Sequence, residues 1–244
     1  MLRRLVNGCT AASTSCVSLL RPGPDGVASQ ASCRSPRSPW ARCGRRDLVG
    51  VAVFSVPMHQ RIIPRHTGLD DPREGVELGR FVLLDEVAGN GETWFLRRAF
   101  ALARAELGVR AVIAYSDPVA RTALDGRLVK PGHLGTIYQA HNGRFLGRAS
   151  PSTLWISPFG RAVPPRAVSK IRNVERGAAY SERLLVDLGA PPRKVGEDPR
   201  AWVERALAGF RRLRHPGNFV YAWPLDRGVE RGMPTGVGYP KAAA

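Results

Sequence analysis

The sequence predicts an α/β fold of the α+β kind, in which a mixed central sheet is flanked by helices within a single domain. Two observations carry this prediction. Short apolar runs typical of buried strands alternate with amphipathic stretches typical of helices between residues 48 and 223. Hydrophobic residues make up 43% of the 244 residues. A chain of this length buries about 70% of its unfolded surface, so the fold needs no disulfide or metal to hold it.

Two strands are predicted before residue 85. Val51–Val56 is a short apolar run, and Val76–Leu84 is a nearly continuous one, as expected of a strand buried on both faces. Gly79 lies in the middle of the second run, where it indicates a β-bulge or a close approach of another backbone. The sequence MHQRIIPRHTG between the two strands is expected to form a basic loop.

A helix and a third strand follow. Apolar residues recur at helical spacing over Glu92–Leu107, with Asn90 placed to cap the start and Gly108 placed to end the helix. Val109–Tyr115 is predicted to be another buried strand, and the proline of the Ser-Asp-Pro sequence at 116–118 turns the chain after it.

The second half is expected to add further elements around the sheet. A hairpin is predicted from Thr153–Ile156 and Arg161–Val163, and Asp198 followed by Pro199 marks a strong helix start. The remaining helices are expected at Thr136–Asn142, Ala167–Arg176 and Tyr180–Leu188, and the last strand at Asn218–Trp223.

The chain is predicted to have three parts: a basic extension over 1–46, the folded domain over 47–228 and a loose tail over 229–244. The extension is rich in Ser, Pro, Arg and Gly without sustained periodicity, which is typical of disorder. A transit peptide, or a start codon assigned too far upstream, are the alternatives. All four cysteines lie in the extension without a C-x2-C pair, so no zinc site is predicted. The domain itself lacks cysteine, which fits a reducing cytoplasm.

The charge balance favours a polyanionic partner. The net charge is +17, from 37 Lys and Arg against 20 Asp and Glu. Residues 1–46 carry eight Arg and one acidic residue, and the later half of the domain is rich in cations with few acids. Nucleic acid is the first candidate partner. No helix-turn-helix, zinc-finger or RNA-binding signature is present. The charge therefore predicts binding to nucleic acid but does not indicate recognition of a particular base sequence.

Two groups of residues carry candidate chemistry. Gly89 and Gly91 lie where a strand passes into a helix, and the amide groups freed by such a turn form a site for a phosphate or pyrophosphate. A simple turn is the alternative, and a Walker loop is excluded because no G-K-[ST] follows. The second group consists of polar residues after the third strand, among them Ser116, Asp117, His133 and Tyr138. A Tyr, a carboxylate and a His that converge perform general acid–base chemistry, whereas structural roles are the alternative for each residue.

The sequence as a whole resembles a known family. The segments that carry the likeness are ELGRFVLLD, GNGETWFL, YSDPVAR, PGHLGTIYQAHNGRFLGRAS, SKIRNVERG and HPGNFVYAW, over roughly residues 50–225. They resemble the Mom family of phage DNA-modification proteins, which implies a divergent member of the GNAT acyltransferase superfamily. The resemblance implies an enzyme that converts the exocyclic amine of adenine in DNA to a bulkier amide-type derivative, of the carbamoylmethyl or methylcarbamoyl type. Such a modification protects the DNA from host restriction enzymes.

The resemblance also implies roles for individual residues. Tyr138 matches the tyrosine that protonates the departing thiolate in GNAT enzymes, and the turn at Gly89–Gly91 matches their site for the pyrophosphate of acetyl-CoA. Glu86 replaces the usual Gln or Arg of that site, and an acid beside a pyrophosphate is unfavourable. The catalytic candidates are Tyr138, Asp117, Ser116, His133 and His59. The candidates for acetyl-CoA binding are Gly89, Asn90, Gly91, Thr93 and Asn142. The candidates for DNA binding are Arg61, Arg121, Lys170, Arg172 and Arg176.

A family proposal involving iron would need His, Asp or Tyr ligands. His59, Asp117, His133 and Tyr138 supply such groups, but their spacing matches no recognised metal motif, so no metal is predicted.

Three functions remain open from the sequence. The first is a cytoplasmic, Mom-like enzyme that acts on double-stranded DNA with acetyl-CoA and without a membrane. The second is an ordinary GNAT acetyltransferase that acts on a protein or a small amine. The third is a DNA-binding protein without catalytic activity. The first is preferred because it alone accounts for both the motifs and the charge.

Overall fold

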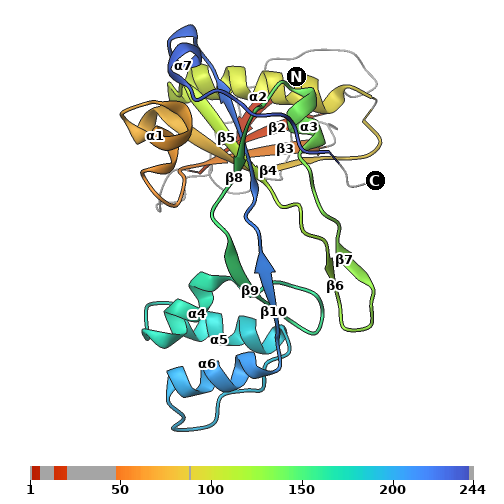
Figure 1. Cartoon of the computed structure of the whole chain (residues 1–244), viewed down its shortest axis with the longest axis vertical. Helices are drawn as coiled ribbons and strands as arrows, with labels where there is room; N and C mark the ends of the chain where they lie inside the picture. Colours follow the sequence, from red (N-terminus) through yellow and green to blue (C-terminus); the bar gives the residue numbers. More distant parts are fainter. Residues whose placement is uncertain (1, 6–13, 21–47, 88, 242–244) are drawn as a thin grey trace. The chain divides into compact units, whose positions relative to one another are not determined.

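The computed structural model describes residues 2–5, 14–20, 48–87 and 89–241, which divide into two compact units (Figure 1). The first unit contains the residues up to Tyr115 together with Gly135–Gly147 and Val220–Tyr239. The second contains Ser116–Leu134, Arg148–Phe219 and the residues after Tyr239. The expected mixed sheet with flanking helices is confirmed, and it belongs to the first unit. The boundaries at 46 and 228 stay predictions.

A seven-stranded mixed sheet forms the first unit, in the order β1-β2-β3-β4-β5-β11-β8. The first four strands in this order pair antiparallel in succession, and β4 and β5 are parallel. The strands are β1 (Leu2–Leu5), β2 (Thr14–Leu20), β3 (Leu48–Ser55), β4 (Gly75–Leu83), β5 (Ala111–Ser116), β8 (Arg144–Arg148) and β11 (Phe219–Pro224).

Two strands of the sheet come from the N-terminal extension. β2 pairs with β3 from Thr14 opposite Ser55 to Leu20 opposite Leu48, and β1 pairs with β2. Here the structure differs from the expected disordered extension, because β3 offers an edge whose backbone groups need partners. Residues 6–13 and 21–47, and with them Cys9, Cys33 and Cys43, lie outside the described residues.

Helix α2 (Gly91–Leu107) covers one face of this sheet. Its Phe95, Leu96 and Phe100 are buried, and the Phe100 ring lies 6.1 Å from Phe54 of β3 and 5.2 Å from Trp223 of β11. The helix therefore begins one residue before the predicted Glu92 and ends at Leu107 as predicted, where Gly108 follows in the left-handed conformation.

Helices α1 (Ile62–Thr67) and α7 (Arg227–Gly232) contribute to a separate cluster in the same unit. Ile63 and Val229 pack there with Ala111, Ile113 and Ala222 of the sheet. Because successive residues of a strand point to opposite faces, Ala222 and Trp223 place this cluster on the face opposite α2. Both helices differ from expectation: the first was expected to be a basic loop and the second part of a loose tail. Burial of their apolar side chains against the sheet explains why they are helical.

The second unit contains two short ribbons and three helices. β9 (Ser152–Ile156) pairs antiparallel with β10 (Arg211–His215), and β6 (Arg121–Thr122) pairs with β7 (Leu128–Lys130). The predicted hairpin between Thr153–Ile156 and Arg161–Val163 forms in part, through an antiparallel bridge between Ile156 and Ala162 and a hydrogen bond of 2.8 Å from the Val163 N–H to the Trp155 carbonyl. The full-length partner of β9 is β10, which the prediction missed. Periodicity identified β9 as a strand but carries no information on a partner so distant in the sequence. The helices are α4 (Pro165–Arg172), α5 (Ala178–Asp187) and α6 (Pro199–Ala208).

The three helices enclose a core of their own. Trp202 of α6 is fully buried in it with Ile171 of α4 and Leu185 of α5, and the Trp202 indole N–H donates to the carbonyl of Pro191 at 2.9 Å. Asp198 caps α6 as predicted, because its carboxylate accepts from the backbone N–H groups of Arg200 and Ala201.

The two ends of the long segment 148–219 lie together. The Arg148 guanidinium lies 4.4 Å from the centre of the Phe219 ring, and the Ala149 N–H donates to the Asn218 carbonyl at 2.8 Å. In the part of the chain that the structure describes, no helix is long and apolar enough to cross a membrane.

Candidate functional site

Strand β4 contains the predicted bulge at Gly79. On the β3 side, Val53 pairs with Arg80 and Phe54 with Leu78, so that Gly79 is an extra residue. On the β5 side, pairing ends at Leu78 and Ala114, although β4 continues to Leu83 and β5 to Ser116. The two parallel strands thus stop pairing at the bulge. Peptide groups beyond that point are available to an extended ligand that carries amides of its own.

The turn before α2 contains Gly89, Asn90 and Gly91, three of the predicted cofactor-binding residues. Asn90 is in the left-handed conformation, with φ of 67°, and its carbonyl accepts from the Trp94 N–H and the Thr93 hydroxyl. Its side chain makes no capping hydrogen bond, so the prediction that Asn90 caps the helix is wrong. A Cβ at Gly91 would lie 2.5 Å from Val87, which explains the glycine there. The Asn90 side chain therefore does not accept a hydrogen bond from the first backbone N–H groups of α2.

Tyr138 is a buried residue of α3 (Thr136–Ala140). Its ring lies 5.5 Å from that of Trp223, edge to face, and 5.4 Å from that of Tyr221. Burial, with the charges of Glu77 and Tyr221, raises its pKa to about 12. Tyr138 therefore keeps its proton at neutral pH and serves as a hydrogen-bond donor toward negative charge.

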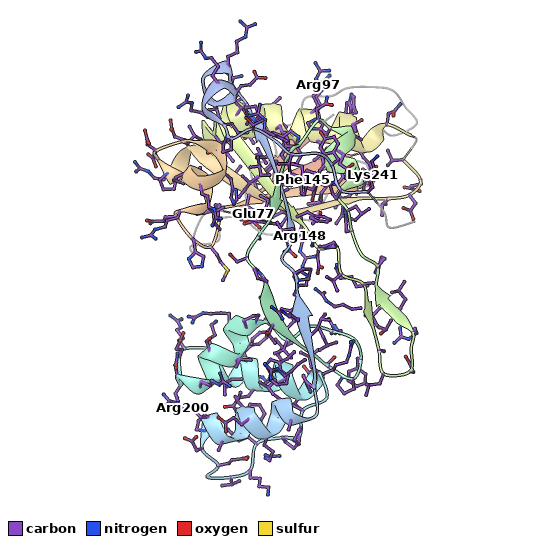
Figure 2. The ribbon with its side chains drawn as sticks, viewed as in Figure 1. Glu77, Arg97, Phe145, Arg148, Arg200 and Lys241 are labelled. Atoms are coloured by element: carbon purple, nitrogen blue, oxygen red, sulfur yellow. The ribbon has the colours of Figure 1, made fainter. Side chains whose placement is uncertain are left out.

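Glu77 is a functional candidate that the sequence analysis missed. It lies on β4 between two apolar residues, opposite Ser55 of β3 and Ile113 of β5 (Figure 2). Burial raises its pKa, and its negative charge in turn raises the pKa values of Tyr115 and Tyr138. A carboxylate with a raised pKa near a protonated tyrosine is suited to accept a proton. A single acidic residue inside an apolar strand was the signal in the sequence that pointed to it.

Asp117 is the centre of an ion-pair network in the second unit. Its carboxylate contacts His215 Nε2 at 2.9 Å, Lys130 Nζ at 3.1 Å and the guanidinium of Arg121, and accepts from the Val119 N–H at 3.0 Å. Burial by itself would raise the pKa of Asp117, but hydrogen bonds from His215, Val119 and Lys130 and the charge of Arg121 lower it to about 2. A carboxylate held ionised in this way is a poor proton acceptor at neutral pH.

His215 is buried and has both ring nitrogens engaged. Nε2 faces Asp117, and Nδ1 accepts from the Gly217 N–H at 3.1 Å. With Nδ1 as an acceptor, Nε2 carries the proton, and the ring links the loop after β5 to strand β10. Because both ring nitrogens of His215 are used in these contacts, we interpret the pair of Asp117 and His215 as a link between two segments of the chain.

Of the other predicted catalytic residues, Ser116 and His133 lie beside Asp117, and His59 belongs to the first unit. Ser116 is buried at the end of β5, and its hydroxyl has no hydrogen-bond partner among the described residues. His133 is exposed in the loop after β7, and its backbone N–H donates to the Asp117 carbonyl at 2.8 Å. His59 is exposed in the first unit, in the turn before α1. Asn142, a predicted cofactor residue, follows α3 in the left-handed conformation.

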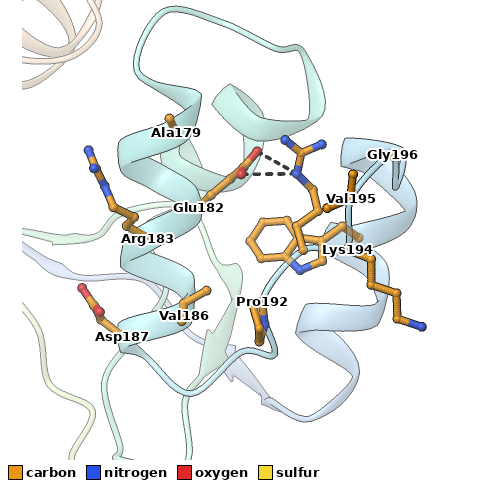
Figure 3. A pocket seen from close by; sticks show the side chains of 11 residues that line it. Ala179, Glu182, Arg183, Val186, Asp187, Pro192, Lys194, Val195 and Gly196 are labelled. Carbon is orange, nitrogen blue, oxygen red and sulfur yellow. Dashed lines mark hydrogen bonds and ion pairs between the residues drawn. The ribbon is translucent and has the colours of Figure 1, made fainter.

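A pocket of about 590 Å³ lies in the second unit between α5 and residues 192–196, and Trp202 is among the residues that line it (Figure 3). The ion pair between Glu182 and Arg193, at 3.2 Å, crosses it. Lys194 points away from it in this view. None of the predicted site residues is among those that line it, so we assign no chemistry to it.

Comparison with known proteins identifies the family. The model of the Mom protein family matches residues 42–188, which is more than half of the chain. The chain belongs to the Mom family. No curated protein gives a significant match. Among solved structures, one similar chain is a tandem GNAT protein from the clavulanic acid biosynthesis pathway, without AcCoA. It is 11% identical with a TM-score of 0.40, over 89% of this chain and 84% of that one.

The Mom-family match spans residues of both units, including Glu77, Asp117 and Tyr138. Of the predicted DNA-binding residues, Arg61 is exposed in the first unit, and Arg121 is only 14% exposed and bound to Asp117. Lys170, Arg172 and Arg176 lie at the end of α4 and in the turn after it. Within the described ranges, no three His, Cys, Asp or Glu residues are grouped as metal ligands.

Proposed function

We propose that this Mom-family chain is an enzyme that modifies the exocyclic amine of adenine in double-stranded DNA, with acetyl-CoA as the donor of the added group. Membership of the Mom family supports DNA modification. The proposed reaction rests on four features that belong to one compact unit: the β4 bulge, the turn before α2, Glu77 and Tyr138.

The first unit has two features that suit acetyl-CoA. The amide groups at the start of α2 suit a pyrophosphate, because the helix dipole is positive at that end and the Asn90 side chain makes no capping hydrogen bond. The unpaired stretch between β4 and β5 suits the amide-bearing arm of the donor, which would hydrogen-bond to β4 as an added strand does. Glu86 is exposed beside the same turn, and its charge opposes the phosphates.

Two side chains supply the acid–base chemistry. Acetyl-CoA supplies an activated acyl carbon. As the adenine nitrogen forms its bond to that carbon and the carbon–sulfur bond breaks, Glu77 accepts the proton that the nitrogen loses. The adenine amine is a poor nucleophile because its lone pair is delocalised into the ring, so this proton transfer is important.

Tyr138 acts on the departing thiolate. A thiol has an ordinary pKa near 8.5, far below the value of about 12 for Tyr138, so complete proton transfer from the tyrosine is unfavourable. The protonated phenol instead donates a hydrogen bond to the developing negative charge, as oxyanion-hole donors do. The base must also leave the duplex stack to reach these groups.

Nucleoside mass analysis tests the proposal. The chain is expressed in a bacterium, genomic DNA is digested, and a heavier deoxyadenosine is expected, whose mass identifies the added group. Glu77→Gln should lower the yield about 10²- to 10⁴-fold, and Tyr138→Phe about 10²- to 10³-fold. Glu230→Gln and Tyr180→Phe are matched controls, because both side chains are exposed and neither belongs to the group described above.

The alternatives predict different results. Unmodified DNA in cells with soluble protein and acetyl-CoA would overturn the proposal. Acetylation of a peptide or small amine would then support an ordinary acetyltransferase. A DNA-binding protein without catalysis predicts that Glu77→Gln and Tyr138→Phe change nothing.

A further inference from the structure

Outside residues 1–46, the positive charge of this chain is concentrated in one of its two units. Residues 1–46 carry eight Arg and one Asp, and the rest of the first unit carries eleven Lys and Arg against eleven Asp and Glu, a net charge of zero. The second unit carries eighteen against eight, a net charge of +10. After residue 46, the excess of cations therefore belongs to the second unit, whereas Glu77 and Tyr138 belong to the first.

Internal ion pairs neutralise only some of these cations. Six of the eighteen contact a carboxylate: Arg121, Arg127, Lys130, Arg166, Arg193 and Arg205. The other twelve have no carboxylate within ion-pair distance among the residues that the structure describes. Five of the eight acidic residues form ion pairs with those six cations, so only three others remain to compete with an external anion for the unpaired cations.

Four of the unpaired cations meet at the C-terminal end of α4. Lys170 and Arg172 belong to its last turn, and Arg176 to the turn that follows. Arg200, at the start of α6, donates from Nε to the carbonyl of Arg172 at 3.2 Å (Figure 2). Lys170 Nζ lies beside Gly177, 3.7 Å from where a Cβ would stand. We call these four residues the α4 patch.

The position of the α4 patch explains how four cations are tolerated together. The carbonyl groups at the end of a helix carry partial negative charge, which stabilises Lys and Arg side chains near them. Arg172, Arg176 and Arg200 are exposed, and Lys170 is half-buried. The guanidinium groups are thus able to contact an external partner without first breaking an ion pair.

We propose that the α4 patch binds the phosphate backbone of double-stranded DNA, so that the second unit holds the substrate while the first modifies it. Duplex DNA carries one negative charge for about every 1.7 Å of its axis, which suits closely placed cations. Glu175, next to Arg176 in the sequence, is paired with Arg166. Single-stranded nucleic acid is bound mainly through aromatic stacking, and no member of the patch is aromatic. The choice of DNA as the polyanion rests on the proposed function.

Salt-dependent binding of the full chain tests this inference. Fluorescence anisotropy with a labelled 25-base-pair duplex of random sequence gives the association constant between 50 and 200 mM salt. Each phosphate that a cation neutralises adds about 0.9 to the salt slope, so the slope of the quadruple variant K170Q/R172Q/R176Q/R200Q should be shallower by about 3.6. The affinity of the wild type should then fall about 150-fold further than that of this variant over the fourfold rise in salt.

The matched control removes four exposed cations from the first unit: R97Q/R98Q/R227Q/R231Q. It has the same net charge as the patch variant, and its salt slope should equal that of the wild type. A second variant, R172K/R176K/R200K, retains the charges and should retain the slope. An equal reduction of the slope in the control, an unchanged slope in the patch variant, or preferential binding of single-stranded DNA or RNA would each overturn the inference.

Failure of this inference is distinguishable from failure of the proposed function. Modified deoxyadenosine formed equally well by the patch variant and the control would refute the α4 patch and leave the enzyme assignment intact. Loss of modification in the patch variant alone, with unchanged thermal unfolding and acetyl-CoA binding, would support the patch. A wild type that neither binds nor modifies duplex DNA would refute both.

Discussion

Replacing Asp117 with Asn removes the negative charge that Arg121, Lys130 and His215 share in the second unit. The Asp117 side chain is 17% exposed, so solvent screens these contacts only in part. Lowering its pKa from the ordinary 3.8 to about 2 corresponds to about 2 kcal/mol of stability. The variant also leaves Arg121, 14% exposed, without its carboxylate. We therefore expect the free energy of unfolding to fall by about 2 to 4 kcal/mol.

The pH dependence of this effect has a definite sign. Because folding lowers the pKa of Asp117, its contribution is fully present above about pH 4, where the unfolded side chain is ionised. It is lost as the pH falls toward 2 and the folded carboxylate takes up a proton. The stability difference between the wild type and D117N, measured by urea unfolding, should therefore shrink from pH 5 to pH 2.

Asp125→Asn is the matched control for this experiment. Asp125 lies in the same part of the chain and is 67% exposed, and its ion pair with the Arg127 guanidinium is 3.9 Å long. Asn can still accept the hydrogen bond that Asp125 accepts from the Arg127 N–H at 2.9 Å, so its replacement should cost less than about 0.5 kcal/mol. If D117N unfolds like the wild type but forms no modified nucleoside, the structural role is refuted. Asp117 would then act in the reaction, as the sequence analysis expected.

Three further substitutions test other parts of the molecule. Glu86→Gln should tighten acetyl-CoA binding about two- to fivefold, because it removes a negative charge near the start of α2. Calorimetry measures this change, and an unchanged Kd would argue against a phosphate site there. Gly135→Ala should cost about 2 to 4 kcal/mol, since φ is +77° and the new Cβ would lie 2.5 Å from the Tyr221 ring; a neutral effect in urea unfolding would contradict a left-handed start of α3. Trp202→Ala should cost about 3 to 5 kcal/mol because the side chain is fully buried, whereas Trp94→Ala, at a side chain 45% exposed, should cost less than about 1 kcal/mol in the same measurement.

Local patterns predicted the elements whose signals are local. The α2 helix, the bulge at Gly79 and the cap at Asp198 follow from spacing, glycine placement and side-chain chemistry within a few residues. Strand β11 was evident because all its residues from Phe219 to Trp223 are apolar or aromatic and are buried.

Features that depend on distant residues were not predictable in this way. β9 is a strand as expected, but its partner β10 lies more than 50 residues further along the chain, and no periodicity reports that pairing. The sequence placed Asp117 beside Tyr138 as a candidate acid–base pair. In the structure, Asp117 instead contacts His215, which lies 98 residues further along the sequence. Glu77 was missed because its significance depends on burial, which a single sequence does not display.

The contact between Arg148 and Phe219 brings together the two ends of the segment that contains helices α4, α5 and α6. The segment between them leaves the sheet from β8 and returns to it in β11, the neighbouring strand, so its two ends start and finish at one place. Because its two ends are close, such a segment can change in length with little strain on the elements that flank it. The sheet that contains β8 and β11 can therefore keep its register while the segment between Arg148 and Phe219 varies. Joining the chain directly at these two residues is the natural way to test whether the sheet folds without that segment.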